Sequence, residues 1–329
     1  MKASLWGVAL TYVGAVIGAG FASGQEIYQF FARFGTSGIM GIAVAGLMFG
    51  ILGYLALERG RKENVGSFGA LLGSLYPRSV VRVAEGVTTA FLVIGLGVVS
   101  AGGGAAVHQL IHLPLLLGGA LTIVAILVVA MRGTASVVRA NSILVPYLIV
   151  LVVLVAALSW SHPASGPASS GSGWLLAAFL YLSYNVFTGI MVLLGLGREL
   201  ASRRQSLAAA ALGAIVLSAL AYLEHHALAT TAHPGALPMV DIAAHLHAVW
   251  GILFGVSLWI ALFTTGVAEA YALREQYGNR LLWLCGATFL FGILGFERLV
   301  ALLYPLMGIV AVMLWAPLIY RRNRGVPGG

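Results

Sequence analysis

The sequence is short of charged residues and of cysteine. Asp, Glu, Lys and Arg together make up 9% of its 329 residues, whereas they make up about a quarter of a typical globular chain. So few charges exclude a soluble protein of this length, because its surface would lack the groups that water solvates best. The single cysteine, Cys285, excludes an intramolecular disulfide. The solvent that suits such a composition is lipid.

Long hydrophobic runs are what the sequence has instead. A helix of about 20 apolar residues spans the hydrocarbon core of a bilayer, and hydrophobic residues form 60% of this chain. The runs predict ten membrane-spanning helices, at 5–31, 37–57, 84–107, 113–131, 141–160, 174–196, 206–228, 248–272, 281–296 and 299–320. The first run continues to Phe31, past any cleavage point of a signal peptide, so we interpret it as a span. The polar stretch from Glu224 to His247 predicts an outer loop with a short interfacial helix.

The basic residues predict the orientation of these spans. With the N-terminus inside, 16 of the 18 Lys and Arg residues fall in inner loops, and only Arg33 and Arg298 fall outside. Inner loops of membrane proteins carry this excess of basic residues. We therefore expect both termini in the cytoplasm, and we attribute the net charge of +8 to membrane orientation rather than to a nucleic-acid partner. The eight histidines lie near the outer face, where we expect no metal site because adjacent helical residues point apart.

The ten runs predict a single transmembrane domain over residues 1–329. Its two halves, 1–160 and 170–321, are similar in length and hold five spans each. An odd number of spans reverses the orientation of the second half. That arrangement permits an inverted repeat, in which the first helices of the two halves form a symmetry-related pair.

The first span is rich in residues that weaken a helix. Gly14, Gly18, Gly20 and Gly24 fall within eleven positions, and each glycine weakens a helix by about 1 kcal/mol relative to alanine. A polar pair ending in Glu26 follows at membrane depth. Backbone opened inside a membrane is tolerated where it lines a cavity, so the pattern predicts a break near Gly18–Gly20. The alternative is that the glycines serve tight packing and that Glu26 lies at the outer rim.

The sixth span, which corresponds to the first in the other half, contains a polar cluster. Ser183, Tyr184, Asn185 and Thr188 interrupt an apolar run and precede Gly189. The cluster predicts a second break near Tyr184–Thr188, although such side chains also bond neighbouring helices. Paired breaks expose free amides and carbonyls that bind charged groups.

The eighth span places oxygen atoms along one face. Thr264, Thr265 and Glu269 follow Ala261 by three, four and eight residues, which puts all four on one side of a helix. Hydroxyl and carbonyl oxygens are ligands that small hard cations prefer. The alternative is that the threonine hydroxyls bond carbonyls of their own turn.

Together these features resemble the amino acid–polyamine–organocation superfamily, whose members have the LeuT-type fold. The stretch Gly-Ala-Val-Ile-Gly-Ala-Gly-Phe-Ala-Ser-Gly-Gln-Glu, from Gly14 to Glu26, and Ser183-Tyr184-Asn185 most resemble its YkvI-like bacterial branch. The resemblance implies an all-α membrane protein with a five-plus-five inverted repeat and broken helices one and six. It also implies a secondary transporter of the bacterial cytoplasmic membrane, with no cofactor other than a coupling ion.

The resemblance further implies a sodium site between helices one and eight. Its ligands would be the carbonyls of Gly14, Ile17 and Ala261 and the hydroxyls of Thr264 and Thr265. Some proton-coupled relatives place a lysine on helix five where this ion would lie. The fifth span here contains no lysine or arginine from Ser142 to Trp160. This absence favours sodium over a lysine-mediated proton route.

The solute site would lie beside this ion. In the family, amides of the helix-one break hold the carboxylate of the solute, and the residues here are Gly18, Ala19 and Gly20. Helix six would contribute Ser183, Tyr184, Asn185 and Phe187. Glu26 and Glu269 depart from the apolar pocket of amino-acid relatives. Because buried acids in membranes are by default functional, each is a candidate to hold an ammonium group, a second cation or a proton, unless it is exposed at the rim.

The sequence therefore predicts a sodium-coupled symporter of an amino acid or a related small amine. Helices one, two, six and seven would move against the rest, so that the central site opens to each side in turn. The alternatives are a proton-coupled permease that uses Glu26 or Glu269, and a ligand-sensing membrane receptor on the same fold. An enzyme is not expected, because the inner loops lack a nucleophile or a catalytic metal constellation. The expected partners are the solute and the lipid bilayer.

Overall fold

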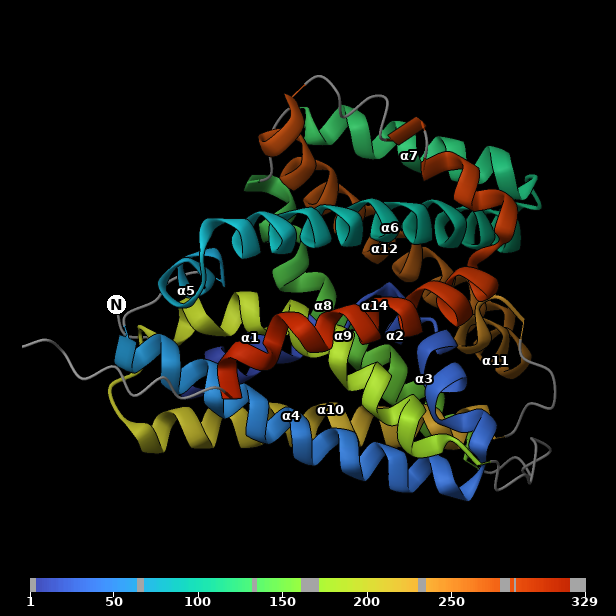
Figure 1. Ribbon diagram of the computed structural model, residues 1–329. Coiled ribbons are helices and arrows are strands. Elements are labelled where there is room, and N and C mark those ends of the chain that lie inside the picture. The colour runs from blue at the N-terminus through green and yellow to red at the C-terminus, as the bar shows by residue number, and fades with distance from the viewer. Residues whose placement is uncertain are drawn as a thin grey trace, which may run out of the picture.

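A computed structural model describes residues 4–63, 68–131, 135–160, 172–229, 235–278, 285–286 and 288–319. This described part of the chain contains helices and no strand (Figure 1), which confirms the all-α class. The helices are α1 Leu5–Val16, α2 Ala19–Ala22, α3 Gln25–Phe30, α4 Thr36–Glu63, α5 Phe68–Leu75, α6 Arg78–Ile111, α7 Leu115–Ala130, α8 Ala135–Ser159, α9 Trp174–Gly197, α10 Arg203–Leu228, α11 Pro238–Leu246, α12 Ala248–Tyr277 and α14 Phe296–Ile319, with 3-10 helices η1 Ala32–Phe34 and η3 Leu290–Leu294.

The long helices coincide with the predicted spans. α4, α6, α9, α10 and α12 are each long and apolar enough to cross a membrane, and they cover the second, third, sixth, seventh and eighth runs. α7, α8 and α14 cover the fourth, fifth and tenth runs. The ninth run, 281–296, lies partly outside the described residues, and its described end forms η3. α11 is the short helix predicted in the outer polar stretch, whereas α5 was not predicted.

The spans pack as two groups (Figure 1). α1, α4, α9 and α10 contact one another, and α6, α7 and α12 form a second group. α8 and α14 contact both groups. The first group contains helices one, two, six and seven, which are the four that were expected to move together. The inverted repeat of 1–160 and 170–321 and the cytoplasmic placement of both termini stay predictions.

Two glycines allow α4 and α9 to cross closely. A Cβ atom on Gly60 of α4 would overlap the carbonyl oxygen of Leu194, and a Cβ atom on Gly197 of α9 would overlap that of Leu57. Small residues at such crossings let two backbones approach each other in a membrane. The contact holds the ends of helices two and six together.

The predicted break in the first span is confirmed. α1 ends at Val16, and the amide of Gly18 donates to the Val16 carbonyl at 2.9 Å instead of continuing the helical pattern to Gly14. A second interruption follows at Gly24, whose φ of 80° lies in the left-handed region that favours glycine. The first span is therefore three short helices, α1, α2 and α3, separated by backbone that departs from the α-helical hydrogen-bond pattern.

The predicted break in the sixth span is wrong. α9 runs as one helix from Trp174 to Gly197. The hydroxyl of Ser183 donates to the Phe179 carbonyl at 2.7 Å, and the side-chain amide of Asn185 donates to the Tyr181 carbonyl at 3.1 Å. The hydroxyl of Thr188 donates to the Asn185 carbonyl at 2.8 Å. The polar side chains bond carbonyls of their own helix, so the backbone does not have to open.

Candidate functional site

Glu26 lies in the first turn of α3, within the broken first span, and its side chain reaches α9. Its side chain is 3% exposed. The hydroxyl of Tyr184 donates a hydrogen bond to Oε2, and the side chain of Asn185 and the backbone amide of Phe21 face the same carboxylate. Oε1 lies against Gly20, where a Cβ atom would overlap it. The structure thus brings together four of the predicted site residues, and it excludes a rim position for Glu26.

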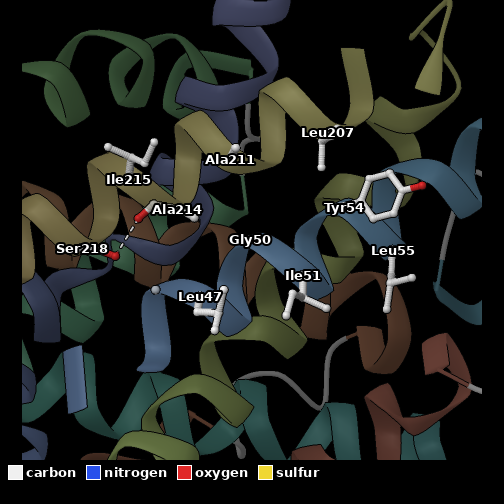
Figure 2. Close-up of a pocket in the computed structure, with 11 residues that line it drawn as sticks. Leu47, Gly50, Ile51, Tyr54, Leu55, Leu207, Ala211, Ala214, Ile215 and Ser218 are labelled. Atoms are coloured by element: carbon white, nitrogen blue, oxygen red, sulfur yellow. Dashed lines mark hydrogen bonds between the residues drawn. The ribbon is translucent and has the colours of Figure 1, made fainter. Parts of the chain in front are cut away.

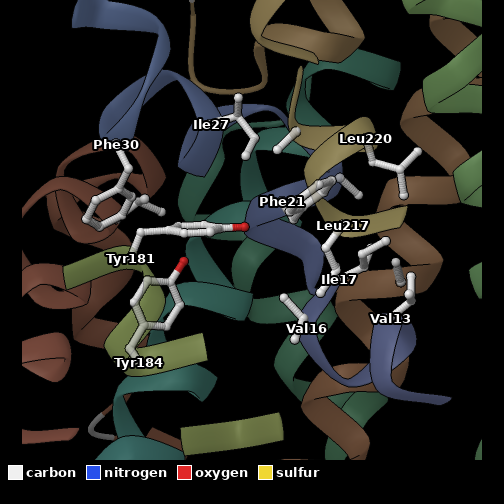
Figure 3. Packing of buried hydrophobic residues seen from close by; sticks show 14 of the residues in the cluster. Val13, Val16, Ile17, Phe21, Ile27, Phe30, Tyr181, Tyr184, Leu217 and Leu220 are labelled. Carbon is white, nitrogen blue, oxygen red and sulfur yellow. The ribbon is translucent and has the colours of Figure 1, made fainter. Parts of the chain in front are cut away.

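Aromatic rings pack around Tyr184, which bonds this carboxylate, and Figure 3 shows Tyr184 with Phe30 and Tyr181. The ring of Tyr184 lies 5.9 Å from that of Phe30, 5.8 Å from that of Tyr181 and 4.8 Å from that of Tyr304, measured between centroids. Tyr181 and Phe30 are each 2% exposed. Such packing excludes bulk water, so electrostatic interactions of Glu26 are stronger than they would be at a surface.

Glu269 of α12 is a second acidic residue in the membrane-spanning region, and it is partly buried. Its Oε2 atom is buried and has no hydrogen-bond partner, while Oε1 lies against Gly95 of α6, where a Cβ atom would overlap it. Tyr304 lies within electrostatic range of both Glu269 and Glu26. The carboxylate of Glu269 therefore lies against α6 although the residue is partly exposed, and its role in solute binding stays a prediction.

Glu224 of α10 is an acid that sequence reasoning missed. It was expected in the outer polar stretch, but α10 continues to Leu228, and the Glu224 side chain is fully buried. Neither of its carboxylate oxygens has a hydrogen-bond partner. Glu26 lies within electrostatic range. The available signal was that Glu224 falls inside the apolar run 206–228.

None of these three acids forms an ion pair with a described residue. The ion pairs of the described chain join Glu58 to Arg61 at 2.7 Å, Glu58 to Lys62 at 3.3 Å, and Arg59 to Glu63 at 3.0 Å, all at the end of α4. The described residues also contain no group of three His, Cys, Asp or Glu side chains that could hold a metal ion. A buried carboxylate without a partner is costly, and it is stabilised by a proton or by a bound cation.

The residues of the predicted sodium site lie on two separate elements. On α12, Ala261 and Thr264 are buried, and the Thr264 hydroxyl donates to the Ala261 carbonyl at 3.1 Å. Thr265 is partly exposed. Gly14 and Ile17 lie on and just after α1, which packs on α9 and α10, whereas α12 packs on α2. Convergence of the five oxygens on one ion stays a prediction.

α11 covers the second interruption of the first span, at Gly24. The amide of Met239 donates to the Ser23 carbonyl at 2.9 Å, and the Met239 side chain lies where a Cβ atom on Gly24 would be. Asp241 accepts a hydrogen bond of 2.7 Å from Gln109, which ties α11 to α6. Burial raises the pKa of the Asp241 carboxyl above its ordinary value. The backbone at Ser23 and Gly24 is thus covered by α11.

A large apolar groove lies elsewhere, between α4 and α10 (Figure 2). It has a volume of 670 Å³ and is lined mainly by aliphatic side chains such as Leu47, Ile51 and Ile215. Leu47 is 66% exposed and Ile215 is 65% exposed. These side chains face outward as lipid-facing residues do, so the groove is not the candidate solute site.

Sequence comparisons find two bacterial proteins that are similar to this chain over nearly its whole length. No family model matches it. It is 28% identical to the uncharacterized membrane protein YkvI of Bacillus subtilis, over 94% of each chain. It is 26% identical to the uncharacterized protein YyaD of the same organism, over 93% of each chain. The resemblance to the YkvI-like branch is confirmed.

Solved structures with the same fold were also found. An inward-facing conformation of Mhp1 matches 96% of this chain and 75% of its own, with a TM-score of 0.71 and 14% identity. MhsT in complex with L-phenylalanine matches 95% of this chain and 88% of its own, with a TM-score of 0.61 and 17% identity. A manganese transporter of Eremococcus coleocola matches 95% of this chain and 77% of its own, with a TM-score of 0.61 and 13% identity. These similarities confirm the LeuT-type fold.

Proposed function

We propose that this multi-pass membrane protein of LeuT-type fold is a secondary transporter that moves an amino acid or a related small amine by alternating access, coupled to a cation. The observation that carries the proposal is Glu26, a buried carboxylate at the break of the first span that has no ion-pair partner among the described residues. A broken helix at the membrane midplane is where transporters of inverted-repeat folds bind solutes. The setting is a bacterial cytoplasmic membrane with both termini inside.

The ammonium group of the solute pairs with Glu26 in this proposal. An ammonium group supplies the positive charge that the buried carboxylate lacks, and the pairing is strong because the surrounding rings exclude water. Amides of Gly18, Ala19 and Gly20 would contact a carboxylate where the solute carries one, and Ser183, Tyr184, Asn185 and Phe187 would line the site from α9. MhsT, which shares the fold, was solved with L-phenylalanine, and this supports the amino-acid class.

Sodium is the proposed coupling ion, bound by Gly14, Ile17, Ala261, Thr264 and Thr265. The second candidate is a proton carried by Glu26 or Glu269. Two observations favour the second candidate: the Thr264 hydroxyl bonds its own turn, and Oε2 of Glu269 is buried without a partner. In either case coupling requires that the cation favours the conformation that binds the solute.

Exchange of labelled solute tests the proposed function. Amino acids and small amines are first screened for thermal stabilisation of the purified protein in sodium and in potassium buffers. The best ligand is then measured by counterflow in proteoliposomes. Wild type and the exposed-site control Glu297→Gln should exchange label, whereas Glu26→Gln should not. Binding without exchange in wild type would contradict transport and favour the receptor.

A further inference from the structure

Glu224 is a buried acid without a hydrogen-bond partner in the described part of the chain. It lies near the end of α10, one turn before Leu228, and its side chain is fully buried. Both of its carboxylate oxygens lack a hydrogen-bond donor. The predicted orientation places this end of α10 near the outer face. The sequence alone assigns Glu224 no role in solute binding or in coupling.

The surroundings of Glu224 are acidic and aromatic. α10 packs against α3, which carries Glu26. The carboxylates of Glu224 and Glu26 are close enough to interact, and Tyr181 of α9 interacts with both. Gln25, the first residue of α3, is 1% exposed, and its Oε1 atom is also buried without a hydrogen-bond donor. The unpartnered oxygens of Glu224 and Gln25 are acceptors, which call for a cation rather than an anion, while Nδ1 of His226, two residues along α10, is also buried without a partner.

The nearby histidines have other contacts. The Nε2 atom of His225 lies 3.0 Å from the Gly35 carbonyl oxygen, and the ring of His226 stacks on Trp160 with centroids 3.7 Å apart. The described ion pairs, all at the end of α4, do not include Glu224. Two buried carboxylates that interact, with no ion pair to a described basic residue, repel strongly in a medium of low dielectric constant.

We propose that Glu224 and Glu26 form an outer cation site, in which a small monovalent cation bound by carboxylate oxygens pauses between the outer face and the helix-one break. The proposal rests on the proposed function, because it adds a step to the route by which a cation reaches Glu26. A cation between the two acids converts their repulsion into two attractive contacts. The same chemistry fits an alkali coupling ion and the ammonium group of a solute.

Direct binding of two probe cations tests the site. Radioactive sodium and labelled methylammonium are bound to the purified full-length protein, with choline as a bulkier competitor. Glu224→Gln keeps the size of the side chain and removes its charge, and Glu297→Gln removes a charge from an exposed position as the matched control. Glu224→Gln should bind at least one of the two probes at least about tenfold more weakly, since contacts between a cation and a buried charged group are worth that much. Glu297→Gln should bind both like wild type.

The outcomes separate the two cation sources and the two proposals. Loss of sodium binding alone identifies a coupling-ion site, and loss of methylammonium binding alone identifies a solute site. Unchanged binding of both probes by Glu224→Gln would overturn the outer site. The melting temperature of Glu224→Gln without added probe should equal or exceed that of wild type, because an unpaired charge has been removed; a marked fall would instead assign Glu224 a structural partner. If wild type binds cations through Glu224 and yet shows no counterflow, the proposed function fails while the site stands.

Discussion

Gly20→Ala should destabilise the protein by roughly 2 kcal/mol, because the new methyl group and the Glu26 side chain would occupy the same space. A Cβ atom on Gly20 would lie 2.8 Å from Cδ and 2.9 Å from Cγ of Glu26, and closer still to Oε1. Glu26 would then have to turn away from Tyr184, losing a hydrogen bond to a charged group that is worth about 1.5–3 kcal/mol. Such a loss should lower the melting temperature by roughly 4–8 °C, at about 2–4 °C per kcal/mol.

Two comparisons make this measurement specific. Gly18 lies in the same break, and a Cβ atom there meets nothing within 4 Å, so Gly18→Ala should not lower stability. Glu26→Ala removes the three atoms that overlap the new methyl group, so adding Gly20→Ala to Glu26→Ala should cost little. Thermal unfolding in detergent micelles, followed by tryptophan fluorescence, measures all four variants and their coupling. An equal loss from Gly20→Ala in both backgrounds would show that Glu26 does not lie against the helix break.

Three further predictions concern coupling, packing and orientation. Thr265→Ala should abolish the sodium dependence of solute binding, whereas Glu269→Gln should change proton dependence or solute choice and leave the sodium response; the reverse result would assign coupling to the carboxylate. Gly60→Ala should cost about 1–3 kcal/mol in thermal unfolding, because its Cβ atom would overlap a carbonyl of α9, and an unchanged melting temperature would refute that crossing. In intact cells, an impermeant thiol reagent should label Glu297→Cys and not Lys62→Cys; the opposite labelling would reverse the predicted topology.

The features that the sequence predicted correctly depend on local composition. Apolar runs define spans because lipid cannot satisfy polar groups, whichever helices pack nearby. The break at Gly18 has the same local origin, since closely spaced glycines weaken a helix within a few residues. The approach of Gly20 and Glu26 is local as well, because only six positions separate them.

The prediction for the sixth span was wrong because a polar cluster in a membrane helix is compatible with two structures, an opened backbone or a continuous helix. Ser183, Asn185 and Thr188 were taken as signs of an opened backbone, but their side chains bond carbonyls one turn earlier and leave α9 intact. The residue types do not distinguish these two structures. The structure shows α9 continuous and packed between α4 and α14.

The sequence by itself determined that this chain spans a membrane many times, that its first span is interrupted, and that acids lie near the interruption. Only the tertiary structure decided which groups meet Glu26. Tyr184 lies 158 residues further along the chain, and Glu224 becomes a neighbour because α10 packs against α3. The apolar run 206–228 indicated that Glu224 lies on a helix, but its burial depends on which distant helix covers the side chain. Hydropathy acts within one segment, whereas the pairing of charges and donors depends on how segments pack.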